Sequence, residues 1–126
     1  VTRVAFDKTG TLTEGRPVVE QVVVIDGTEA EAVGLAAAVE AARGLVYRAA
    51  WLKDQGREFA KDAAIAKLYT GELSKRVADR ALQLHGGYGF MDEYAISRLY
   101  RDQKVLEIGE GTNEVQRMVI ARHLGL

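Results

Sequence analysis

The chain has 126 residues, a length typical of one domain, and its 17 basic and 18 acidic side chains give a net charge of −1. It contains no cysteine, which excludes disulfides and thiolate metal sites, and we expect no metal ion. The charges are mixed, without a basic stripe, and no apolar run approaches ~20 residues, so we expect neither nucleic acid nor a membrane as a partner. The first residues lack a signal-peptide pattern, and we therefore expect a cytoplasmic protein.

Two runs rich in β-branched residues predict two strands near the start of the chain, at residues 3–6 and 18–25. The polar loop between them contains glycines and the only proline of the chain, which break regular structure. The sequence therefore predicts an N-terminal β-hairpin over residues 3–25.

The loop of this hairpin contains residues 7–13, which read DKTGTLT. The motif resembles the phosphorylation site of heavy-metal P-type ATPases, and the resemblance extends over residues 1–40. In that family the aspartate, here Asp7, takes the phosphoryl group from ATP. Such chemistry also needs a Mg²⁺ site and a nucleotide domain, which do not follow in this chain, so we expect Asp7 to be an inactive loop residue.

The remainder of the chain has the apolar spacing of helices separated by glycines, and we expect helices at residues 28–54, 58–85, 95–106 and 112–123. In the second helix, apolar residues recur every three or four positions and predict one buried stripe: Ala64, Ile65, Leu68, Tyr69, Leu73, Val77, Ala81 and Leu84. In the last helix we expect four side chains to face the core: Val115, Met118, Val119 and Ala121.

Residues 81–122 contain QLHGGYG and, further on, EGTNEVQR. This stretch resembles the C-terminal helical domain of acyl-CoA dehydrogenases, and the resemblance runs back to about residue 41. It implies that Glu110 is the base that removes the α-proton of the substrate. It also implies FAD contacts at Gln83, Gly86 and Gly87, which match a part that touches the flavin of a neighbouring subunit, and at Thr112 and Glu114.

The two resemblances together predict a single chimeric domain over residues 1–126, joined near residues 38–43. We expect an α+β fold, mostly α, in which the β-hairpin packs on a four-helix bundle. The flavin-binding parts of an acyl-CoA dehydrogenase do not precede residue 41, so we expect Glu110 to be inactive and the FAD contacts to be empty. Gly86 and Gly87 also have the simpler use of turning the chain between two helices.

The first functional hypothesis is therefore a recombined or engineered module without native catalytic activity, which binds no small molecule. In acyl-CoA dehydrogenases these helices pack against other domains and neighbouring subunits, which the predicted fusion lacks. Apolar helix surfaces are therefore left without partners, and we expect this module to form a homodimer. The alternative hypothesis is an acyl-CoA dehydrogenase fragment, of the oxidoreductase class, that still binds FAD or acyl-CoA. Titration of both ligands against tryptophan fluorescence distinguishes the two hypotheses.

Overall fold

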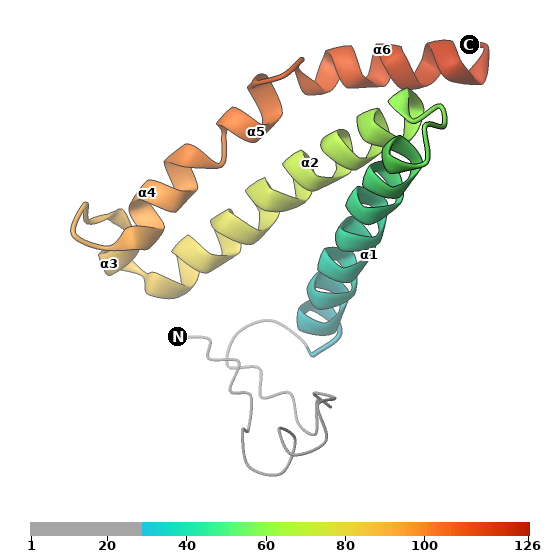
Figure 1. Ribbon diagram of the computed structural model, residues 1–126. Helices are drawn as coiled ribbons and strands as arrows, with labels where there is room; N and C mark the ends of the chain where they lie inside the picture. Colours follow the sequence, from blue (N-terminus) through green and yellow to red (C-terminus); the bar gives the residue numbers. More distant parts are fainter. Residues whose placement is uncertain (1–28) are drawn as a thin grey trace.

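The computed structural model describes residues 29–126, which form six α-helices: α1 (Glu29–Asp54), α2 (Ala60–His85), α3 (Gly87–Phe90), α4 (Ala95–Asp102), α5 (Val105–Ile108) and α6 (Asn113–Leu124). The helices α1 and α2 form a hairpin whose arms diverge from the turn that joins them (Figure 1). The chain then runs back along α2 through the short helices α3, α4 and α5 and ends in α6, which lies against α2.

The turn between α1 and α2 is made by Gly56, whose backbone φ of 64° is left-handed. Its amide donates to the carbonyl oxygen of Lys53 at 2.9 Å, and the amide of Arg57 donates to that of Leu52 at 2.9 Å. These bonds satisfy carbonyls that a helix end leaves free, which is the ordinary role of glycine after a helix. The expected end of the first helix is thereby confirmed.

The second long helix, α2, is the centre of the fold, because it packs against α1, α3, α4, α5 and α6. The buried apolar side chains of the described residues are small at four of six positions: Ala42, Leu52, Ala64, Ala66, Leu73 and Ala78. Alanines let helix backbones approach closely, but they bury little apolar area each. The two leucines therefore supply a large share of the buried apolar surface.

The expected fold class, α+β, is wrong: residues 29–126 are helical and contain no strand. The four-helix bundle is also wrong, because three long helices and three short ones are observed. The single helix expected at 95–106 is divided into α4 and α5. The β-hairpin expected at residues 3–25 lies outside the described residues. None of the helices in residues 29–126 combines the length and apolar character that crossing a bilayer requires.

An ion pair connects the two arms of the hairpin. The Nε of Arg48 in α1 donates to Oδ1 of Asp62 in α2 at 2.6 Å, and the Asp62 side chain is 15% exposed. This hydrogen bond from Arg48 holds the pKa of Asp62 below its ordinary value of 3.8. The lowered pKa means that the folded state favours the ionised carboxylate, so the pair stabilises the fold only while Asp62 is charged.

We expect Asp62→Asn to lower the free energy of unfolding at pH 7 by ~0.2–1 kcal/mol, the range for exposed ion pairs. Because the pKa is lowered on folding, this difference is fully present above the ordinary aspartate value. It should disappear as the pH falls below 3.8 through the lowered pKa. Urea unfolding of the variant and the unchanged chain at pH 7 and pH 3 measures the difference. A difference that is equal at both values contradicts the prediction, and Asp79→Asn, on the exposed side of α2, is the control.

Candidate functional site

The turn between α5 and α6 carries Glu110, the predicted base, between two glycines. After the turn, Thr112 caps α6, because its Oγ1 accepts the backbone N–H of Val115 at 3.4 Å. The carboxylate of Glu114 follows in the first turn of α6. Hydrogen bonds from its own backbone N–H and from the Thr112 hydroxyl lower the pKa of Glu114, so that carboxylate stays charged to a lower pH than an ordinary glutamate.

The backbone of Glu110 has a φ of 56°, and among residues 29–126 it is the only non-glycine residue with a left-handed φ. Such a conformation costs an L-residue roughly 1–2 kcal/mol, because its Cβ crowds the following carbonyl oxygen. The side chain is exposed and projects from the turn rather than packing in the core. Strained backbone of this kind is kept where the surrounding structure enforces it, and it is concentrated at functional sites.

Gln116 is the side chain that contacts this turn from α6. It is 9% exposed, and its Nε2 donates to the carbonyl oxygen of Glu110 at 3.2 Å and to that of Gly111 at 3.1 Å. A Cβ on Gly111 would lie 2.8 Å from the same Nε2, and the φ of Gly111 is 89°. The left-handed φ therefore favours glycine at position 111, and a side chain there would displace the Gln116 amide.

The helix α2 supports the turn from the other side. A Cβ on Gly71 would lie 3.0 Å from the carbonyl oxygen of Leu106, so α2 and α5 approach closely at this point. The Nζ of Lys67 donates to Oδ1 of the buried Asn113 at 3.3 Å, and Arg117 of α6 forms an ion pair with Glu72 of α2. These contacts fix the beginning of α6, and with it the turn, on the first half of α2.

We expect Glu110→Gly to raise the free energy of unfolding of the chain by about 0.5–1 kcal/mol. Glycine removes the cost of the left-handed φ, and part of that gain is offset because glycine is more flexible in the unfolded chain. The exposed Glu93 is not left-handed, so Glu93→Gly should lower stability instead. Urea unfolding of both variants measures the two changes, and a loss of stability in Glu110→Gly would show that its φ carries no strain.

The predicted flavin contacts fall into two groups. Thr112 and Glu114 lie beside Glu110 on the α5–α6 turn, whereas Gln83, Gly86 and Gly87 lie at the far end of α2. Gly86 follows Gly71 by fifteen residues, which is about 22 Å along a helix. The two groups therefore lie apart, one beside the middle of α2 and the other at its C-terminal end.

The end of α2 is open to approach. Gly86 has a φ of 56°, its amide donates to the carbonyl oxygen of Gln83 at 3.0 Å, and an added Cβ on Gly86 or Gly87 would meet no atom within 4 Å. Gln83, Gly86 and Gly87 are all exposed. Exposed backbone without side chains is what a flat, polar ligand needs for close approach. These residues therefore fit a nucleotide cofactor, and they also turn the chain into α3.

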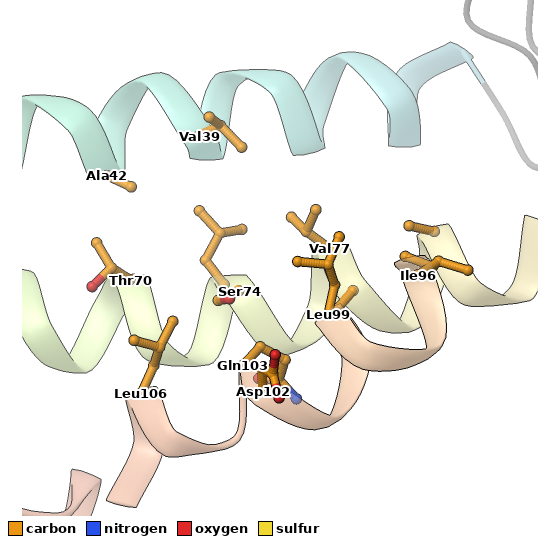
Figure 2. A pocket seen from close by; sticks show the side chains of 13 residues that line it. Val39, Ala42, Thr70, Ser74, Val77, Ile96, Leu99, Asp102, Gln103 and Leu106 are labelled. Atoms are coloured by element: carbon orange, nitrogen blue, oxygen red, sulfur yellow. The ribbon is translucent and has the colours of Figure 1, made fainter. Parts of the chain in front are cut away.

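An apolar groove of about 610 Å³ opens between α1, α2 and α4. Val39 and Ala42 of α1 lie across it from Thr70, Ser74 and Val77 of α2 (Figure 2). The other lining residues are Leu73, Ala78, Ala81, Ile96, Leu99, Asp102, Gln103 and Leu106. Asp102 is the only charged residue of the lining, so the groove suits apolar groups and offers little acid–base chemistry.

The model of the acyl-CoA dehydrogenase C-terminal domain matches residues 3–125. This chain belongs to the acyl-CoA dehydrogenase family. Probable acyl-CoA dehydrogenase YngJ of Bacillus subtilis (strain 168) is 52% identical over 90 residues, which are 71% of this chain and 24% of that protein. This acyl-CoA dehydrogenase segment thus spans about a quarter of the length of the curated relatives it matches.

Solved structures give the same family. Butyryl-CoA dehydrogenase from Megasphaera elsdenii matches with a TM-score of 0.71 and 39% identity, over 85% of this chain and 30% of that one. The FAD complex of PigA matches with a TM-score of 0.68 and 35% identity, over 71% of this chain and 23% of that one. The resemblance of residues 41–126 to acyl-CoA dehydrogenases is thereby confirmed.

The comparisons give no support to the P-type ATPase resemblance of residues 1–40, and the match to the acyl-CoA dehydrogenase domain begins at residue 3. The expectation of a chimeric, recombined or engineered protein is therefore not supported. Asp7 lies outside the described residues. Of the predicted site, the structure brings Glu110, Thr112 and Glu114 together.

Three residues that support the α5–α6 turn were not predicted from the sequence, namely Gln116, Asn113 and Gly71. Gln116 and Asn113 are polar, so the spacing of apolar residues does not indicate that they are buried. The sequence feature that could have indicated their burial is the spacing of the two side-chain amides. Asn113 and Gln116 are three positions apart, which places both on one face of α6. Both are buried, whereas Val115 and Met118, which were expected in the core, are 44% and 70% exposed.

Proposed function

We propose that this chain is the C-terminal helical part of an FAD-dependent acyl-CoA dehydrogenase, an oxidoreductase in which Glu110 removes the α-proton of an acyl-CoA thioester. The observation that carries the proposal is the left-handed backbone of Glu110, whose exposed carboxylate lies on a turn held by the buried Asn113 and Gln116 of α6. A carboxylate in this setting can reach a substrate without leaving the folded domain. Its role is that of a general base.

The residues that would hold FAD are Gln83, Gly86 and Gly87 for one flavin, and Thr112 and Glu114 for a second one. The bound cofactor supplies the acceptor for the hydride that leaves the β-carbon of the substrate. This chain contributes the orientation of Glu110, the free backbone of the two glycines, and a helix N-terminus at Thr112. Since the chain spans a quarter of its relatives, the remaining contacts to flavin and substrate belong to parts beyond it.

A hybrid protein tests the proposal. Residues 29–126 of this chain replace the matching C-terminal part of YngJ, to which the chain is 52% identical over 90 residues. We expect the purified hybrid to retain FAD, and an acyl-CoA added without oxygen to bleach the flavin absorbance. A folded hybrid that contains FAD and is bleached by no acyl-CoA of short, medium or long chain would contradict the proposal.

A second measurement, of ligand binding by fluorescence, can be made on the isolated chain. Trp51 is its only tryptophan and is 52% exposed on α1. Titration of FAD and of an acyl-CoA against Trp51 fluorescence reports whether the isolated chain binds either ligand. Saturable binding supports the fragment as a ligand-binding module. If the hybrid is active but the isolated chain binds neither ligand, the other parts of the enzyme supply the contacts that FAD and acyl-CoA binding requires.

We also propose that the isolated chain pairs with a second copy through α1 and the apolar groove. The helix α1 exposes several large apolar side chains: Val33, Val39, Val46, Tyr47 and Trp51. Exposed apolar surface beside an open groove favours association, and a two-fold pairing lets one surface cover its copy. Light scattering over a dilution series tests this, and a mass that stays at 13.8 kDa throughout contradicts it.

A further inference from the structure

We infer that Gln116 is the positioning residue for Glu110: its side-chain amide holds the turn in the left-handed conformation that presents the carboxylate. The inference rests on the proposed role of Glu110 as the base. Gln116 itself touches neither substrate nor cofactor in this scheme. It acts through the backbone of the residue that does.

The hydrogen bonds of Gln116 depend on the backbone conformation of the turn. Both of its bonds go to carbonyl oxygens, at 3.2 Å on Glu110 and 3.1 Å on Gly111. The position of these two oxygens depends on the φ and ψ of residues 110 and 111, so one amide group fixes both left-handed residues. A change to an ordinary φ at Glu110 would move at least one oxygen away from Nε2.

The chemistry of the contact requires an uncharged donor. Two carbonyl oxygens need two hydrogens, and a carboxamide nitrogen carries two. A glutamate at position 116 would set carboxylate oxygens against carbonyl oxygens, and a lysine would place a charge in a site that is 9% exposed. Gln116 lies at the fourth residue of α6, and helical side chains lean toward the N-terminus of their helix, so its amide reaches the preceding turn.

The anchor of this amide is rigid. Asn113, one turn before Gln116, is 5% exposed and is bonded to Lys67 of α2, and Arg117 is paired with Glu72 of α2. The start of α6 is therefore held on α2 independently of the turn. Gln116 transmits that fixed position to Glu110, whose own side chain is exposed.

The first test is made on the chain itself. In the unchanged chain, the Gln116 side-chain amide hydrogens should be protected from solvent exchange, and the Cα and Cβ chemical shifts of Glu110 should be those of a left-handed residue. In Gln116→Met, which keeps the shape and removes both donors, the Glu110 shifts should move to those of an ordinary negative φ. Gln116→Glu should act in the same direction.

Gln103→Met is the matched control, since Gln103 is a half-buried amide that donates to Tyr100 within its own segment at 3.2 Å. The Glu110 shifts should be unchanged in this variant. Unprotected Gln116 hydrogens in the unchanged chain would overturn the inference without any variant. Unmoved Glu110 shifts in a folded Gln116→Met chain would overturn it as well.

The second test uses the hybrid with YngJ. Gln116→Met should lower kcat about ten- to a hundredfold, the effect of misplacing a catalytic group by about 1 Å, with the KM for acyl-CoA and the FAD content unchanged. A variant with displaced Glu110 shifts and full kcat would refute the positioning role. A hybrid with Gln116 intact and no turnover would refute the proposed function instead, while the shifts in the isolated chain still decide whether Gln116 holds Glu110.

Discussion

Glu110→Gln in the hybrid with YngJ is expected to lower the rate of flavin bleaching by about 10²–10⁴-fold, the usual contribution of a positioned general base. Glutamine keeps the size of the side chain and the left-handed backbone but accepts no proton. Binding contacts made by the rest of the site are unchanged, so the FAD content and the affinity for acyl-CoA should be preserved. Stopped-flow absorbance with saturating acyl-CoA measures the rate directly.

The control for this prediction is Glu93→Gln, which changes an exposed glutamate in the loop before α4 and should leave the rate unchanged. If the Glu110→Gln hybrid bleaches its flavin at the full rate, the base must be another residue. A hybrid that loses FAD on this substitution would show that Glu110 has a structural role in the cofactor site, which its exposed position argues against.

Leu52→Ala is expected to lower the free energy of unfolding by about 2–4 kcal/mol, the range for large-to-small changes in a core. Leu52 is 4% exposed and lies in the last turn of α1, next to the turn that leads into α2. The other buried apolar residues of this core are mostly alanines, which cannot expand to fill the space. The cavity should therefore persist, and the loss should lie well above that of an exposed site.

Met118→Ala serves as the control, because Met118 lies on α6, outside the proposed pairing surface on α1, and is 70% exposed. Urea unfolding followed by helical circular dichroism, at one protein concentration for all variants, gives both values. The fixed concentration matters because self-association shifts apparent stability by mass action. Equal losses for the two substitutions would show that the hairpin of α1 and α2 has no cooperative core at Leu52.

The placement of the three long helices, α1, α2 and α6, could be predicted from the sequence because helix formation depends on neighbouring residues. Glycines at 56 and 86 and the cap at Thr112 mark boundaries by local backbone chemistry, and the observed ends of α1, α2 and α6 agree with the expected ones within a few residues. The prediction of a buried stripe on α2 is confirmed in part: Ala64 and Leu73 are buried, but Tyr69 is 37% exposed. Periodicity indicates which side of a helix is apolar, not how completely a neighbour covers it.

The sequence by itself thus determined the three long helices, the motif around Glu110 and the family resemblance, since each depends on residues that lie close together along the chain. The tertiary structure alone decided the left-handed φ of Glu110, the Gln116 contact and the separation of the two groups of flavin candidates. These features depend on α6 packing against α2, a contact between residues more than forty positions apart, such as Lys67 and Asn113. A local pattern carries no information about such a contact, because its geometry is fixed only when both helices are in place.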